Sequence, residues 1–451
     1  MRIGLVLLFV FVEQCLFAQI TDSVKITGQI LPDTGATFKP DKADIRLVPY
    51  NDGESVSVTQ VNNDGSFVIK VAVKVTGMYD LKYKSYKMSL LLSPAEPVYM
   101  VIIKTDARQE VKSMRISGSK ENDAYRAFKK ENMRFKDLLR DFRRDCEAND
   151  KNCVDKYKKK LATQNELMEY LKNGYKGTFT AGVLASLGEV PQGNSNGPLL
   201  SQMQSGFFDA ANFLDTALYR TPDLSNKISW YLDYLADTSA NNRLSFISNM
   251  MDKTKADKVV QKNMLMVLFN NFLDEYREPY VESLVKWAKA NQSLLDAKQP
   301  VLAAKIKLVA QVLPGLPAPD VSGENLSQQT QTLQTVAKAN KLTLLIFWES
   351  DCPHCRKAMP DFIRIYKEYH ARGLEVFAAS LDTDKTKWKQ FIDYNHLSWT
   401  NIVLPEKSSA HSDYFIQYTP TVVLIDSKGK IVRRFIGVDD LEKAISAVLD
   451  K

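Results

Sequence analysis

An apolar run followed closely by a pair of cysteines constrains this chain more than any other feature. Residues 342–348 are almost wholly apolar, and a run of this length and composition predicts a buried β-strand. The tetrad Cys352-Pro353-His354-Cys355 comes soon after it. Because proline suits the first turn of an α-helix, we expect a helix to begin at Pro353. Cys352 is therefore predicted at a strand-to-helix junction, near the positive end of the helix dipole.

This placement favours a reactive thiol at Cys352. The helix dipole and a cationic imidazole at His354 both stabilise a thiolate, which is the nucleophile of disulfide exchange. Cys355, one helical turn further on, is placed to resolve a mixed disulfide. We expect His354 to lower the pKa of Cys352, with a solvated imidazole of little influence as the alternative. Asp351 would raise that pKa, so the reduction potential is not readable from the sequence.

Residues 313–451 resemble the thioredoxin superfamily, and motifs beyond the tetrad carry the resemblance. Pro360 follows the second cysteine at the position where thioredoxins kink their first helix, and residues 418–426 resemble the family's cis-proline loop leading into a strand. Gly437 follows the last predicted strand, where the family also keeps a glycine. Residues 316–321 are similar to the start of exported TlpA/ResA-like thiol-disulfide oxidoreductases.

The resemblance implies a mixed sheet with helices on both faces and a surface that docks an extended client chain. Thr419, Pro420 and Gly437 are its expected substrate-binding residues. In the family the proline is cis and faces the cysteines, and the residue before it offers backbone groups to the client. An ordinary trans proline at a strand start is the alternative.

The resemblance also raises the question of the proton path. Thioredoxin places a buried acid in the strand before the cysteines, whereas this chain has Ile346 there. Relatives nearer this branch place an acid at the end of the next strand, which makes Asp382 the candidate for relaying a proton. A helix N-cap or turn role for Asp382 is an equal alternative. Glu349 is a second acid close to the cysteines in sequence.

Two rival readings of the tetrad fit less well. Zinc commonly takes four ligands from two paired knuckles, but His354 sits awkwardly between the cysteines and no second pair lies nearby. Peroxiredoxins carry Thr or Ser three residues before the peroxidatic cysteine and Pro seven before, where this chain has Glu349 and Leu345. We expect no metal and no cofactor.

The first residues have the pattern of an export signal. Arg2 supplies a positive start, residues 3–12 an apolar core and Ala18 a plausible cleavage point, which predicts a signal peptide over residues 1–19. Lipid attachment at Cys15 and an uncleaved anchor are the alternatives. We expect the mature protein in the periplasm or cell envelope of a Gram-negative cell, with no integral membrane span after signal cleavage.

A second cysteine pair, Cys146 and Cys153, remains in the mature chain. On one unbroken helix the two would lie too far apart for a bridge. Residues 149–152 have the composition of a turn between two helices, and a helical hairpin there would bring the sulfurs together. A structural disulfide is the favoured prediction, and two free thiols are the alternative.

The rest of the chain predicts two further domains. Residues 20–118 carry short alternating runs separated by turns, with a hairpin signal at 62–65, and predict a β-sandwich. Residues 120–312 have helical periodicity and predict an all-α domain, including one helix over 199–219. Proline and glycine at 313–319 mark the boundary to the third domain, 313–451, an α/β thioredoxin fold with a mixed sheet.

The sequence therefore predicts an exported thiol-disulfide oxidoreductase. Its expected partners are client proteins with thiols or disulfides and an unidentified redox partner that recycles the cysteines. The net charge of +7 is modest for 451 residues and does not indicate nucleic-acid binding. The alternative is an envelope binding or scaffold protein in which the redox domain is secondary.

Overall fold

A computed structural model describes residues 23–32, 38, 43–50, 55–106, 108–146, 150–189, 199–236, 239–274, 277–294, 300–435 and 441–450. The expected signal peptide and Gly437 lie outside these residues. The chain divides into two compact units, Met1–Ala236 and Asp237–Lys451. This division is coarser than the predicted domains, whose boundaries near 118 and 312 stay a prediction.

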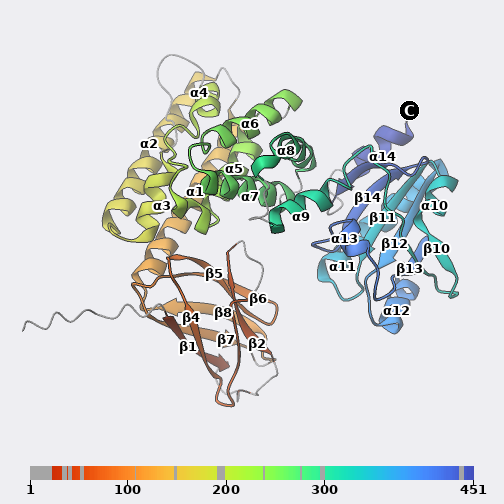
Figure 1. Ribbon diagram of the computed structural model, residues 1–451, viewed down its shortest axis with the longest axis horizontal. Helices are drawn as coiled ribbons and strands as arrows, with labels where there is room; N and C mark the ends of the chain where they lie inside the picture. Colours follow the sequence, from red (N-terminus) through yellow and green to blue (C-terminus); the bar gives the residue numbers. More distant parts are fainter. Residues whose placement is uncertain are drawn as a thin grey trace, which may run out of the picture. The chain divides into compact units, whose positions relative to one another are not determined.

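The first unit begins with two four-stranded sheets that share one apolar core (Figure 1). One sheet has the order β4-β1-β7-β8, formed by Ser66–Ala72, Ser23–Pro32, Val98–Thr105 and Val111–Ser117. The other has the order β3-β2-β5-β6, formed by Ser57–Gln60, Asp44–Pro49, Gly77–Tyr83 and Tyr86–Leu92. Alternate residues face the core, as in β4, where Phe67, Ile69 and Val71 are buried. The predicted sandwich architecture is thus present.

The turn at residues 62–65 forms, but the hairpin predicted around it is wrong. Gly65 adopts a positive φ of 82°, and its N–H donates to the carbonyl of Asn62 at 2.9 Å. The strands on either side, β3 and β4, belong to different sheets. Turn chemistry fixes a local reversal of the chain, whereas the burial of side-chain faces decides which strands pair.

The helices of the first unit are α1 to α5 and one 3-10 turn. Their bounds are Lys120–Asp145, Lys151–Gly174, Phe179–Leu187, Leu199–Gly206, Thr216–Arg220 for the 3-10 turn η1, and Asp223–Tyr234. The single helix predicted over 199–219 is wrong, because α4 ends at Gly206 and the chain turns before η1. Glycine disfavours a continuing helix, and the Asp215 carboxylate restarts helical structure by accepting the N–H of Ala217.

A disulfide joins Cys146 to Cys153 across the connection between α1 and α2, with Cα atoms 5.7 Å apart. The Asp150 carboxylate caps α2 by accepting the N–H of Cys153 at 3.0 Å. The rings of Phe142 and Tyr157 pack edge to face between the same two helices. The α1–α2 hairpin is therefore held by a covalent bond, a cap and an aromatic pair.

The second unit begins with four helices: α6 (Ala240–Asp252), α7 (Lys258–Asp274), α8 (Glu278–Ala290) and α9 (Pro300–Val309), with a 3-10 turn at Gln292–Leu294. Most residues of α7 are buried, including Met264, Leu268 and Phe272. Across the described ranges, no helix combines the length and apolar character needed to cross a bilayer.

A seven-stranded mixed sheet forms the rest of the second unit, in the order β10-β9-β13-β12-β11-β14-β15 (Figure 1). The strands are Thr330–Thr332, Ser322–Glu324, Thr400–Val403, Leu374–Ser380, Leu342–Trp348, Thr421–Asp426 and Ile431–Phe435. β11, β12 and β13 are parallel to one another, β14 runs antiparallel to β11, and β15 runs antiparallel to β14. β9 and β10 were not predicted, since three residues carry too little pattern.

Helices cover both faces of this sheet. α11 (Pro353–Tyr369), α12 (Lys385–Asn395) and α14 (Leu441–Leu449) share a core with the face that carries Leu344 and Ile346. α10 (Leu333–Ala339) and α13 (Ala410–Asp413) share a core with the opposite face, which carries Leu345 and Phe347. Successive residues of β11 thus enter different cores, which is why the strand is apolar throughout. The predicted fold class, a multidomain chain ending in a thioredoxin fold, is confirmed.

Candidate active site

The two cysteines of the tetrad lie at the start of α11, shortly after the end of β11. Every residue of β11 is buried, and Cys352 is the N-cap of α11 with Pro353 in the first turn. The Cys352 sulfur accepts the N–H of Cys355 at 3.4 Å. An N-cap normally accepts such a bond through an oxygen, so the sulfur here occupies the position where a helix stabilises negative charge.

Hydrogen bonds lower the pKa of Cys352 below its ordinary value. Burial is the largest single effect and opposes the shift, but hydrogen bonds from the Thr419 side chain and from the backbone of Cys355 and His354 together outweigh it. The residue is half-buried, so its sulfur remains reachable. A thiolate at this site is therefore both favoured and accessible.

Cys355 has the opposite character. It lies in the first turn of α11, where it is fully buried, and burial raises its pKa to about 12. Its sulfur is also near the backbone N–H of Glu349, which partly offsets the effect of burial. At neutral pH Cys355 is therefore held as a thiol, in contrast to Cys352, whose pKa is lowered.

The loop before β14 faces Cys352. The Thr419–Pro420 peptide bond is cis, and the Cys352 thiol donates to the Thr419 carbonyl at 3.3 Å. The Thr421 hydroxyl donates to the carbonyl of Tyr418, which ties the loop to the start of β14. The structure therefore brings Thr419 and Pro420 to the cysteines, while Gly437 lies outside the described residues.

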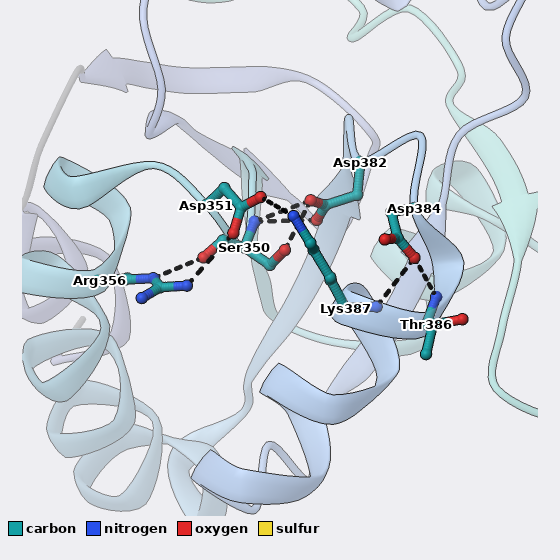
Figure 2. A network of polar contacts seen from close by, with 7 residues as sticks. All are labelled: Ser350, Asp351, Arg356, Asp382, Asp384, Thr386 and Lys387. Carbon is teal, nitrogen blue, oxygen red and sulfur yellow. Dashed lines mark hydrogen bonds and ion pairs between the residues drawn. The ribbon is translucent and has the colours of Figure 1, made fainter. Parts of the chain in front are cut away.

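His354 is exposed, and its contribution to the lowered pKa of Cys352 comes from its backbone N–H. The effect expected from its imidazole stays a prediction. Asp351 is exposed as well, and its carboxylate pairs with Lys387 at 2.7 Å and with Arg356 at 3.4 Å (Figure 2). The bond from Lys387 lowers the pKa of Asp351, and the two cations offset the charge that was expected to disfavour a thiolate.

Asp382 holds the turn that precedes Cys352. Its carboxylate accepts the backbone N–H of Ser350 at 2.9 and 3.1 Å and the Ser350 hydroxyl at 2.7 Å (Figure 2). The Ser380 hydroxyl donates to the same carboxylate at 2.7 Å. Within the described part of the chain, no hydrogen bond joins Asp382 to Cys355. Asp384, not Asp382, is the N-cap of α12.

Glu349 and Asp382 both line an open pocket of about 620 Å³. The pocket is large enough to admit water to these two acids. Among the described residues, no group of three or more His, Cys, Asp or Glu side chains is placed to hold a metal ion.

Sequence reasoning missed Ser350, Arg356 and Lys387. The Arg356 Nε donates to the Ser350 carbonyl at 2.7 Å, and its position near Asp351 along the chain is a local signal that could have found it. Lys387 lies one strand and one helix away from Asp351, so no local pattern indicates their pairing.

Comparisons with known proteins agree with this geometry. Residues 314–434 match the family model described as the AhpC/TSA family. The chain is 35% identical over 126 residues to the thioredoxin-like protein YneN of Bacillus subtilis, covering 27% of this chain and 71% of that protein. It is 32% identical over 97 residues to the thiol-disulfide oxidoreductase ResA of Halalkalibacterium halodurans, covering 22% of this chain and 54% of that protein.

The chain thus spans about half the length of that ResA. Among solved structures, the thioredoxin domain of a thiol-disulfide oxidoreductase from Bacteroides vulgatus is 26% identical, covering 30% of this chain and 97% of that one, with a TM-score of 0.29. The extent of the YneN match decides the family. The chain belongs to the thioredoxin-like proteins, and its relatives include proteins named thiol-disulfide oxidoreductases.

Proposed function

We propose that this protein is an exported enzyme that exchanges disulfides with client proteins through Cys352 and Cys355. One observation carries the proposal: the half-buried sulfur of Cys352 lies between the N-terminus of α11 and the carbonyl of Thr419, with Cys355 buried one turn behind it. A purely structural thiol does not need a lowered pKa next to a peptide-binding loop.

The exchange balances in two steps. The Cys352 thiolate attacks one sulfur of a client disulfide, the client S–S bond breaks, and the other client sulfur leaves as a thiolate that takes up a proton. Cys355 then loses its proton and attacks the Cys352 sulfur, releasing the second client thiolate. The client gains two electrons and two protons, and the enzyme is left with a Cys352–Cys355 disulfide. The same residues serve the reverse direction, and a separate redox partner resets the enzyme.

Each neighbouring residue has a role in this scheme. The backbone of Thr419, next to cis-Pro420, pairs with an extended client segment, as a strand adds to a sheet edge. Asp382 keeps Ser350 and the following turn in place, so that Cys352 stays at the helix terminus. Proton relay by Asp382 requires water from the adjoining pocket, because its carboxylate is bonded to the two serines.

Export to the periplasm is part of the proposal. It is supported by the pattern of residues 1–19 and by the disulfide between Cys146 and Cys153, since structural disulfides persist in oxidising compartments. Fractionation of cells that express the full chain tests this location. Recovery of the protein in the cytoplasm with its leader uncleaved would rule export out.

The test of the chemistry is insulin reduction in dithiothreitol, followed as precipitation of the insulin B chain. The mature protein should accelerate precipitation, and Cys352→Ser should abolish the acceleration. The matched control replaces Cys146 and Cys153 by serine, which also removes cysteines but should leave the rate unchanged. Equal rates for the mature protein and Cys352→Ser would end the enzyme proposal.

A second candidate, a binding or scaffold role for the first unit, is favoured by one observation. Val68, Thr27 and Met100 lie side by side across β4, β1 and β7, and Val68 and Met100 are 44% and 55% exposed. Apolar side chains grouped on an outer sheet face indicate a contact surface. Clients trapped by Cys355→Ala with and without Val68→Ser and Met100→Ser should differ if this face selects them. An identical set of clients would remove the candidate.

A further inference from the structure

The C-terminal end of α7 contacts the cis-proline loop. The Tyr418 hydroxyl donates to the Asp274 carboxylate at 3.3 Å, and Asp274 is the last residue of α7. Tyr418 directly precedes Thr419, whose carbonyl lies 3.3 Å from the Cys352 sulfur. The helix α7, which lies outside the thioredoxin fold, therefore contacts the loop that faces Cys352.

The first residue of α8 is linked to the same loop indirectly, through Arg434 of β15. The Glu278 carboxylate accepts the backbone N–H of Arg434 at 2.9 and 3.0 Å. The Arg434 guanidinium in turn donates to the carbonyl of Phe415 at 2.9 Å. Phe415 has a positive φ of 47° and begins the segment that runs to Tyr418. The segment 415–418 is thus bonded near both of its ends.

The Glu278 contact is largely buried, whereas the hydrogen bond between Tyr418 and Asp274 lies at the surface. The Glu278 side chain is only 13% exposed, and a buried carboxylate is costly unless it is paired. Burial raises the pKa of Glu278 to about 7, and the backbone N–H of Arg434 together with the guanidinium groups of Arg434 and Arg433 offsets part of that effect.

Glu278 also closes an edge of the sheet. β15 is the outer strand beyond β14, and its unpaired backbone N–H groups would otherwise offer a template to an incoming strand. The N–H of Arg434 is already occupied by Glu278. An extended client can therefore pair with the cis-proline loop, but it cannot pair with β15 through the N–H of Arg434.

We propose that Asp274 and Glu278 form a brace that positions the cis-proline loop against Cys352 and directs extended clients onto Thr419. This inference rests on the proposed function, because it concerns how a client chain is held. The brace residues touch neither sulfur, so they are positioning residues. Their loss should weaken the docking of a polypeptide and spare the attack of Cys352 on a small disulfide that needs no backbone pairing.

The experiment compares Glu278→Ala and the milder Asp274→Asn with the wild-type full chain. The control is Glu442→Gln, which breaks a surface ion pair with Arg364 away from the loop. The KM for insulin should rise about tenfold in Glu278→Ala and about threefold in Asp274→Asn, the effect of losing a hydrogen bond to a charged group. The kcat and the rate of the reduced protein with the small aromatic disulfide DTNB should stay within about twofold of wild type.

A second readout does not depend on activity. Hydrogen exchange at the amides of residues 415–419 should speed up in both brace variants and not in Glu442→Gln. An unchanged KM, unchanged exchange, or a DTNB rate that falls in parallel with insulin reduction would overturn the brace. Failure of the proposed function looks different, because the wild type itself would then leave insulin intact, and the exchange measurement would still decide the inference.

Discussion

Replacing Asp382 by alanine is expected to loosen the turn in front of Cys352 and to destabilise the second unit. Three donors lose their acceptor: the backbone N–H and hydroxyl of Ser350 and the hydroxyl of Ser380. Ser350 and Ser380 are 1% and 0% exposed, so water does not readily replace the carboxylate. The backbone N–H has no freedom to find another partner, whereas the hydroxyls can rotate.

A buried donor left unsatisfied costs about 1–3 kcal/mol, and with partial compensation by the hydroxyls we expect a total of about 3 kcal/mol for Asp382→Ala. Asp382→Asn keeps one acceptor oxygen and should cost about 1 kcal/mol. The matched control is Asp384→Asn, which retains an N-cap for α12 and should be nearly neutral.

The assay uses Cys355 as a local reporter, because it is fully buried in this unit. In a Cys352→Ser background, modification of Cys355 by a thiol reagent across a urea series reports unfolding of this part of the chain alone. A loss of 3 kcal/mol should lower the urea midpoint by about 1 M or more.

The reasoning is refuted if Asp382→Ala leaves the midpoint within about 0.3 M of its parent. In that case the serine bonds contribute little. If Asp382→Asn then slowed release of a mixed disulfide about a hundredfold, a direct proton relay would replace the positional role given to this carboxylate.

Three further predictions concern the two cysteine pairs and one buried acid. Alkylation of Cys352 should have its pH midpoint below that of an ordinary thiol, while Cys355 stays unmodified at neutral pH; equal reactivity of the two would contradict this. Replacing Cys146 and Cys153 by serine should lower the stability of the first unit by about 2 kcal/mol, from the short loop that the bond closes, as measured by urea unfolding. Burial raises the pKa of Glu278 to about 7, so protonated Glu278 contributes its full stability below pH 4.5, and this contribution is lost as the pH rises through 7. The free energy of unfolding of the wild type should therefore fall by roughly 3 kcal/mol across that window, and Glu278→Gln should remove this fall. Parallel plots of unfolding free energy against pH for the two proteins would contradict the prediction.

Local chemistry explains why the strand, the tetrad and the helix were predictable. The seven apolar residues of β11, the N-cap cysteine and Pro353 are consecutive or nearly so, and each fixes its own conformation. The predicted start of α11 at Pro353 agrees with the structure to the residue, and β14 lies within residues 418–426, where the resemblance placed a loop leading into a strand. The pattern of Cys146 and Cys153 around a turn was readable for the same reason.

Contacts between distant residues explain what was not predictable. Lys387 reaches Asp351 across 36 residues and Tyr418 reaches Asp274 across 144, and neither pair leaves a mark in local sequence. The role of Asp382 depends on where Ser350 lies, which only the pairing of β11 with β12 decides. The prediction of one helix over 199–219 was wrong because apolar residues such as Phe207 and Phe208 are buried in the core although they lie in a turn and not in a helix.

The central claim is that Cys352 attacks and Cys355 resolves. Its most direct measurement is the mass of Cys355→Ala after incubation with a peptide that contains one disulfide, followed by peptide mapping of the adduct. The account predicts one peptide per protein, attached to Cys352, and no stable adduct on the protein with both cysteines. An adduct on another cysteine, or no adduct at all, would contradict it.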